Sequence, residues 1–445
     1  MRAGVVGAVL MAALLAGCSS GSKQPPFTGE PYLVVWAGDA DRKNTDFLAV
    51  IDADPRSATY GKVLKTYPVQ SRGNEPQGLN AIPRADRRLF ATGVLSNRTY
   101  VFDLRQPLAG RVMKADDARD RQLWAPHEVA TLPNGHVVVT AADRARYRGE
   151  AREVLATPGG LVELDADGQF VREVSALPVG QGFIAAPWGA AVAPKLGRIV
   201  TTSRGHGFAA TTRNPVAPGI TVQVWRLNDL GLEKTAVLEA GKRGEENLGP
   251  QVPRLARKEP FVFVNTHEGG ALYASDSIEQ PEPAFRLVFD FGAGALPGGA
   301  GLTPDDRFYV TALTGRNKLA ALDVSDPWHP KVASALGFEE EPGGSGHRRT
   351  GGPSAVTLSA DGTRVAVADY TIDVPGYALG GDCRVYVVRL DPATGALRFD
   401  TAFRDEVTGE VGVDFGRSSW PHGETGPARP AAVLFVTPEP PPSKS

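Results

Sequence analysis

The clearest alternation of apolar and polar residues lies between Gly351 and Asp400. Short runs with a period of two, such as Arg364–Ala368 and Arg384–Leu390, indicate β-strands. Asp361-Gly362 and the segment Asp391–Gly395 supply turn residues between these runs. Four antiparallel strands joined by such turns make one blade of a β-propeller, so this stretch predicts one blade.

Comparable sets of short strands precede this stretch, at intervals of about 50 to 60 residues. The first set shows only three strands, and the apolar run Ala431–Val436 near the C-terminus can complete it. We therefore predict an all-β fold, a seven-bladed β-propeller over residues 31–437 whose ring closes when a C-terminal strand pairs with the N-terminal blade. Residues 438–445 are expected to form a disordered tail. The six earlier sets begin near Tyr32, Gln77, Glu128, Trp188, Pro250 and Gly299.

Composition supports a globular protein built from many short strands. The 445 residues are 42% apolar and 22% charged, and the 51 glycines and 36 prolines suit frequent turns. The formal net charge is −2, and no run of basic residues interrupts the chain. We therefore expect no binding to nucleic acid.

The N-terminus has the pattern of a bacterial lipoprotein signal. An apolar run from Val5 to Leu15 is too short to span a bilayer, and Leu15-Ala16-Gly17-Cys18 resembles a lipobox. Residues 1–17 are thus predicted to be a signal peptide, and residues 18–30 a flexible tether that begins at lipidated Cys18. The alternative is an ordinary signal peptide that ends near a cysteine. Both place the body outside the cytoplasm, and the lipoprotein interpretation places it in the periplasm or cell envelope, anchored to a membrane.

The second cysteine and the histidines are the remaining candidates for chemistry. Cys383 lies at the start of a predicted strand, so we expect a buried, inert thiol. Two of the seven histidines, His136 and His329, fall in turns of one face. The other five are predicted to share the opposite face, where they could form a metal or acid–base site: His127, His206, His267, His347 and His422.

Several segments carry family-like motifs in the same order along the chain. The widest is Asp46–Tyr60, which reads D-F-L-A-V-I-D-A-D-P-R-S-A-T-Y. Asn97–Asp103, Leu322–Pro330 and Gly351–Asp369 are the others. Together they resemble the selenium-binding protein and methanethiol oxidase family, in which the first motif reads D-Y-L-A-x-V-D-x-D-P-x-S-x-x-Y. The resemblance implies a seven-bladed propeller.

The resemblance also implies copper, because oxidases of this family hold copper with histidines that face the channel. In the family's segment H-H-S-G-W-N, this chain has Glu75–Asn80 (E-P-Q-G-L-N) and lacks both histidines. Trp124–His127 keeps one histidine of a second segment, and Ala431–Leu434 replaces the family's H-E-L-R. One imidazole cannot hold copper tightly without partners, so we name Glu75, His267 and His422 as possible co-ligands of His127.

Three functions remain open at this stage. The first is a non-enzymatic binding module for a small molecule or a partner protein, with Asn80, Glu128, Arg204 and His206 as candidate ligand-binding residues. The second is a divergent copper-dependent oxidase of a small thiol such as methanethiol. The third is a hydrolase of the propeller lactonase kind, in which Glu75, Asn80 and Glu128 would surround a divalent ion.

Overall fold

Short apolar runs separated by Gly-, Asp- and Pro-containing turns form seven antiparallel sheets in the computed structural model. The structure describes residues 29–81, 88–117, 121–148, 151–155, 158–176, 185–205, 218–258, 260–340, 352–370 and 381–439. The predicted signal peptide and Cys18 lie outside these ranges, as do His206 and His347. No helix in the described ranges is long and apolar enough to cross a membrane.

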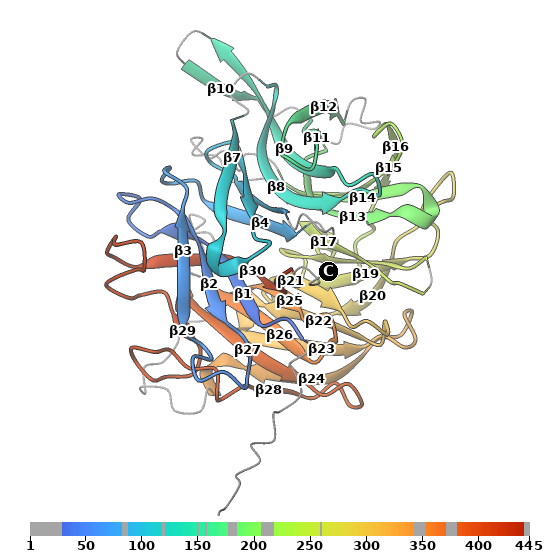
Figure 1. The fold of residues 1–445 in the computed structure, drawn as a ribbon. Coiled ribbons are helices and arrows are strands. Elements are labelled where there is room, and N and C mark those ends of the chain that lie inside the picture. The colour runs from blue at the N-terminus through green and yellow to red at the C-terminus, as the bar shows by residue number, and fades with distance from the viewer. Residues whose placement is uncertain are drawn as a thin grey trace, which may run out of the picture.

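The sheets are the blades of a propeller and are arranged around a central channel (Figure 1). The first combines β1 (Tyr32–Asp39), β2 (Phe47–Asp52) and β3 (Val63–Pro68) with β30 (Ala428–Val436). The second is β4 (Pro76–Ala81), β5 (Arg88–Gly93), β6 (Arg98–Asp103) and β7 (Arg111–Asp117). The third is β8 (Leu123–Thr131), β9 (Val137–Arg148), β11 (Gly160–Leu164) and β12 (Phe170–Ser175), with β10 (Ala151–Leu155) beside β9.

The other four sheets follow one another along the chain. The fourth is β13 (Pro187–Ala193), β14 (Arg198–Gly205), β15 (Pro218–Arg226) and β16 (Leu232–Val237). The fifth is β17 (Pro250–Leu255), β18 (Val262–Thr266), β19 (Ala271–Ser275) and β20 (Arg286–Asp290). The sixth is β21 (Pro297–Leu302), β22 (Phe308–Leu313), β23 (Lys318–Asp323) and β24 (Lys331–Gly337). The seventh is β25 (Pro353–Leu358), β26 (Arg364–Asp369), β27 (Arg384–Leu390) and β28 (Leu397–Phe399), with β29 (Val413–Asp414) beside β27.

The ring closes through the two ends of the chain, as predicted. Strand β30 pairs with β1 in antiparallel register from Tyr32↔Val436 to Asp39↔Ala428. It becomes the innermost strand of the first sheet and also contacts β25 and β4 of the neighbouring sheets. The seven-bladed all-β architecture is therefore confirmed.

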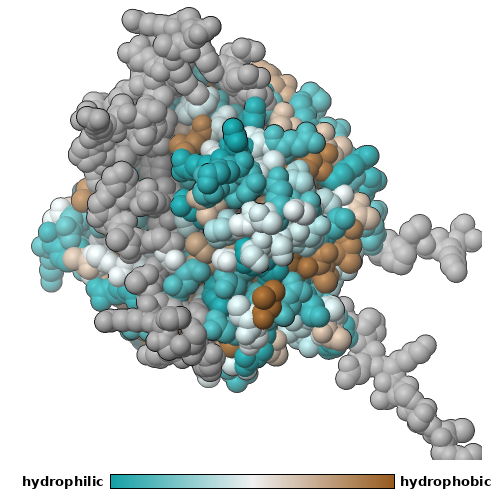
Figure 2. Space-filling model, turned by 90° about the vertical axis from the view of Figure 1, so that its left-hand side faces the viewer, coloured by the Kyte–Doolittle hydropathy of each residue, from teal (hydrophilic) through white to brown (hydrophobic). Residues whose placement is uncertain are grey.

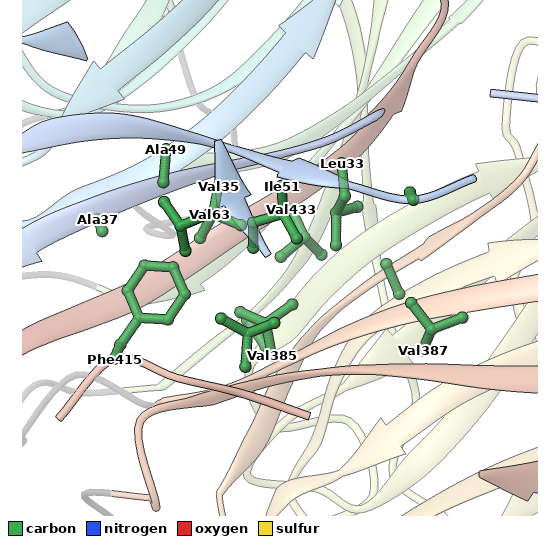
Figure 3. Close-up of a cluster of buried hydrophobic side chains, with 14 of the residues drawn as sticks. Leu33, Val35, Ala37, Ala49, Ile51, Val63, Val385, Val387, Phe415 and Val433 are labelled. Carbon is green, nitrogen blue, oxygen red and sulfur yellow. The ribbon is translucent and has the colours of Figure 1, made fainter. Parts of the chain in front are cut away.

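The hydrophobic core lies between neighbouring sheets rather than at the centre of the ring. At the closure, Leu33, Val35 and Ile51 face Val385 and Val387 of the seventh sheet (Figure 3). All five side chains are at most 1% exposed. Burial of this kind contributes about 25 cal/mol for each Å² of apolar surface, so each boundary between sheets stabilises the ring.

Large apolar side chains on the surface are few and do not gather into one patch. The most exposed among the described residues is Val407 at 73%, followed by Val332 at 59%. On the face shown in Figure 2, small hydrophobic patches lie apart among hydrophilic residues. Scattered residues of this kind are usual for a protein surface.

Two features differ from the strands expected. The run His136–Ala141 continues as β9 to Arg148 and turns back as β10, so a hairpin projects from the rim of the third sheet (Figure 1). Strand β29 adds a short fifth strand to the seventh sheet.

Cys383 directly precedes β27 and has a φ of 54°. Its thiol is half-buried, and burial, more than any other cause, raises the pKa of this thiol to about 11.

Candidate functional site

Every innermost strand carries a proline in its first half, toward the end of the strand that we call upper, and this proline sets the geometry of the channel wall. After each proline the pairing with the second strand shifts by one residue, which is a β-bulge. Proline suits this place because its missing N–H leaves no ladder hydrogen bond unmade. The seven residues are Pro76, Pro126, Pro187, Pro250, Pro297, Pro353 and Pro430.

The bulges turn the two residues after each proline toward a common hollow, which we call the upper cavity. In six of the seven sheets, both of these residues line the upper cavity, whose volume is about 150 Å³. The exception is the fourth sheet, where Trp188 stacks on His127 with ring centroids 3.6 Å apart. Arg204, Arg254, His267 and Tyr370 complete the polar part of the wall.

His127 is held by two contacts and by the stacked indole. Its Nδ1 lies 3.1 Å from the Trp188 carbonyl oxygen, and its Nε2 lies 3.2 Å from Oε1 of Gln77. A backbone carbonyl only accepts, so Nδ1 carries the proton and Nε2 is the acceptor of the neutral ring. Nε2 therefore accepts from Gln77 only with the amide turned so that its NH2 group faces the ring. Burial, aided by the positive charge of Arg204, lowers the pKa of His127 to about 3. The ring is therefore neutral at physiological pH.

His267 repeats this arrangement from the fifth sheet. Its Nδ1 donates to the Pro297 carbonyl oxygen at 2.9 Å, which leaves Nε2 as the acceptor of the ring. Burial lowers the pKa of His267 to about 4, and Arg204 again contributes. Both imidazoles are thus neutral and are oriented through Nδ1 by a backbone carbonyl of the next innermost strand.

The charged groups of the cavity are two arginines and one glutamate. Arg204 lies over the Trp188 ring at 5.3 Å and 3.6 Å from a carboxylate oxygen of Glu268. Arg254 donates from Nε to the Ala300 carbonyl at 2.6 Å. Burial raises the pKa of the Glu128 carboxyl against the opposing charge of Arg254, which favours the neutral acid. Two guanidinium groups face a single carboxyl group, so the lining carries net positive charge in either protonation state of Glu128.

Three predicted site residues lie away from this cavity. The Glu75 carboxylate accepts from Tyr370 at 2.7 Å and from Arg42 at 3.0 Å. The Asn80 amide donates to the Val129 carbonyl at 2.6 Å. His422 packs on Phe47 of the first sheet, and its ring nitrogens contact Thr66 and Glu424 at 2.8 and 3.1 Å. None of the three lines the upper cavity.

The residues that the structure describes do not fit a copper centre. Within the part of the chain that the structure describes, no group of three or more His, Cys, Asp or Glu side chains is placed to hold a metal ion. The structure brings His127 and His267 to one cavity but leaves Glu75 and His422 in other hydrogen-bond networks. The ring of acidic and amide groups expected for a lactonase is not assembled either, because only Glu128 of that set reaches the cavity.

Sequence reasoning identified His127, Glu128, Arg204 and His267 but missed Gln77, Gln251, Arg254 and Tyr370, which also line the cavity. The sequence itself contains a signal for three of these residues. Gln77 and Gln251 directly follow the repeated prolines, and Arg254 lies on the same strand as Gln251. An alignment of the seven sets on their prolines would have placed these residues on the channel wall.

Comparison with known proteins agrees with the motifs. No protein-family model matches the chain. A methanethiol oxidase of Pongo abelii is 24% identical over 72% of this chain and 76% of its own length, and one of Hyphomicrobium sp is 27% identical over 71% and 72%. A hypothetical selenium-binding protein from Sulfolobus tokodaii superposes with a TM-score of 0.71 at 18% identity, over 93% of this chain and 94% of that one. The chain is therefore similar in sequence to methanethiol oxidases, and its fold is that of the hypothetical selenium-binding protein.

Proposed function

We propose that this protein is an exported binding module, anchored to a membrane through lipidated Cys18, whose upper cavity holds a small anion. The observation that carries the proposal is the pairing of two guanidinium groups with two neutral imidazoles around one hollow of about 150 Å³. A cavity of this size suits a ligand of a few non-hydrogen atoms. The proposed location is the periplasm or the cell envelope.

The wall supplies both charge and hydrogen-bond specificity to such a ligand. Arg204 and Arg254 attract the anion, and charge-assisted hydrogen bonds are the stronger kind. The lone pair on Nε2 of His267 accepts from an O–H or N–H group of the ligand, whereas Nε2 of His127 would have to exchange its contact with Gln77 for one with the ligand. In its protonated form, which burial favours, Glu128 donates a further hydrogen bond. These charged and hydrogen-bonding groups together favour a partly protonated small anion, such as bicarbonate, over a halide ion, which has no hydrogen to donate.

Calorimetric titration of the mature chain from Gly21 with bicarbonate, acetate and chloride tests this proposal. We expect bicarbonate to bind tightest and Arg204→Gln to weaken it about tenfold or more, because a charge-assisted hydrogen bond is lost. The matched control is Arg398→Gln, which removes an exposed arginine on β28, the outermost strand of the seventh sheet, which contributes no residue to the cavity lining. Equal affinities in the wild type and Arg204→Gln would contradict the proposal. Fractionation of cells that express Cys18→Ala tests the anchor, since the variant should leave the membrane fraction.

The second candidate is a copper-dependent oxidase of a small thiol. It is favoured by the orientation of His127 and His267, because metal-binding histidines commonly donate their other ring N–H to a backbone carbonyl. It also agrees with the similarity to proteins named methanethiol oxidase. It needs a third ligand that the described residues do not supply. Stoichiometric copper retained after dialysis, and lost in both His127→Ala and His267→Ala, would favour the oxidase over the binding module.

A further inference from the structure

A second hollow of about 350 Å³ opens at the lower face of the channel, and we call it the lower chamber. Its wall comes from the innermost strands β17, β21, β25 and β30. Arg254, Val356 and Thr357 line both the upper cavity and the lower chamber. These three residues therefore form the neck that separates the two spaces.

The positive charge at the neck has a fixed position. Arg254 donates from Nε to the carbonyl oxygen of Ala300 on the neighbouring strand β21, at 2.6 Å, and from Nη1 to Pro253 of its own strand, at 2.9 Å. The planar guanidinium is thus oriented by two carbonyl groups. Its charge lowers the pKa of Glu128 in the upper cavity, against the larger effect of burial. The electrostatic influence of Arg254 therefore extends into the upper cavity.

The lower chamber combines this charge with an apolar wall. Arg257 adds a second cation at the rim, and the acidic group of the lining is Glu30. The Glu30 carboxylate already accepts from the Ala360 N–H at 3.0 Å and lies 3.7 Å from Arg364. Most of the remaining lining is apolar, and includes Leu255, Leu302, Leu434 and Phe435.

We propose that the lower chamber is a separate binding site for a small amphiphilic carboxylate. The carboxylate group would bind Arg254 at the neck, and the alkyl chain would lie along Leu302 and Phe435. Ligand pockets are commonly apolar with a few placed polar groups, and they start at about 300 Å³. The upper cavity, at about 150 Å³, lacks room for such a chain. This site does not depend on the function proposed for the upper cavity.

Calorimetric titration of the mature chain with octanoate tests the site, with 1-octanol and acetate as companion probes. Octanol keeps the alkyl chain but lacks the charge, and acetate keeps the charge but lacks the chain. We expect octanoate to bind about tenfold tighter than either, because both the charge-assisted contact and the apolar contact contribute. Octanoate that binds no tighter than octanol would overturn the proposal.

Variants test whether octanoate binds in the lower chamber. Arg254→Gln should weaken octanoate about tenfold, whereas Arg204→Gln, which changes only the upper cavity, should leave its affinity unchanged. Leu302→Trp fills the chamber without changing its charge, and it should weaken octanoate but not acetate. It provides an independent test if Arg254→Gln fails to fold. Loss of octanoate binding in Arg204→Gln, or full retention in both Arg254→Gln and Leu302→Trp, would overturn the site.

Discussion

Two parts of the channel wall differ in how their innermost strands are joined. In sheets two to five, one polar residue on the second strand lies opposite the bulge and joins two innermost strands. Its side chain accepts an N–H from the strand of its own sheet and donates to a carbonyl of the next sheet. We call these four the latch residues: Thr92, Thr140, Thr202 and Asn265. In sheets six, seven and one, the same position holds Ala312, Ala368 and Trp36.

The chemistry of the upper cavity follows the same division. The latched sheets contribute its imidazole, guanidinium and carboxyl groups, whereas the residues after the proline in the other sheets are Gly, Ser or Ala. A latch fixes the backbone on both sides of a bulge, and a fixed backbone holds a side chain in place before a ligand arrives. The polar half of the ring is therefore preorganised, which lowers the entropic cost of binding.

The largest effect is expected where a side chain would force a latch apart. A Cβ added at Gly78 would lie 1.9 Å from the carbonyl oxygen of His127 and 2.9 Å from the Thr92 hydroxyl. We expect Gly78→Ala to lower the free energy of unfolding by about 3 kcal/mol, as measured by urea denaturation. Gly299→Ala is the matched control in the unlatched sixth sheet, where the closest atom would be 2.6 Å away. A larger loss for Gly299→Ala would contradict the comparison.

A smaller effect is expected when only the latch hydroxyl is removed. Thr140 is fully buried, accepts from the Glu128 N–H at 2.9 Å and donates to the Trp188 carbonyl at 2.7 Å. Thr140→Val keeps the shape but removes the partner of the Glu128 N–H and leaves the Trp188 carbonyl with His127 as its donor, at a cost of about 2 kcal/mol in the free energy of unfolding. Thr311→Val in the sixth sheet, whose hydroxyl makes only contacts of 3.2 and 3.3 Å, should cost less. Similar losses in the two variants would show that the latch adds no stability.

The dependence of stability on pH is a slope rather than a single loss, and it tests the polar half of the ring without disturbing a latch. The pKa values of His127 and His267 are about 3 and 4 in the folded protein, below the ordinary value of 6.5. Between pH 6.5 and pH 4 the unfolded chain therefore binds more protons, so stability falls as pH falls. Each histidine should contribute about 1.4 kcal/mol per pH unit in this range. Urea denaturation of the double variant His127→Gln/His267→Gln should show a flatter slope.

The control for this slope is His329→Gln, because the His329 side chain is 79% exposed. We expect this variant to keep the slope of the wild type. An unchanged slope in the double variant would mean that both channel imidazoles titrate normally, and would contradict their neutral state in the folded protein.

The fold could be predicted because its causes are local. Alternation with a period of two and turns such as Asp361-Gly362 define the strands, and an apolar run at each end of the chain indicated closure. The β9–β10 hairpin was missed although Arg144–Arg148 alternates (R-A-R-Y-R), because three of these five residues are arginine and few residues of the run are apolar. The bounds of the predicted signal peptide and tether are not tested by the described residues.

The site could be predicted only in part, because side-chain direction depends on backbone geometry. His127 and Glu128 were found from their place before an innermost strand, and both line the cavity. Glu75 was expected there too. Its backbone has a φ of 53° at the start of a bulge, and its carboxylate binds Arg42 and Tyr370 instead of lining the cavity. A bulge adds one residue to one strand, and alternation along the chain does not reveal where the side chains after that extra residue point.

The pairing of β1 with β30 also matters while the chain is being synthesised. Strand β1 is among the first parts of the propeller to leave the ribosome, and its partner is among the last. At about 5 to 20 residues per second, synthesis leaves the inner edge of β1 open for tens of seconds. Leu33, Val34 and Val35, fully buried in the closed ring, are exposed on that open edge in the nascent chain. Until β30 is made and pairs with β1, this edge is open to pairing with strands of other chains.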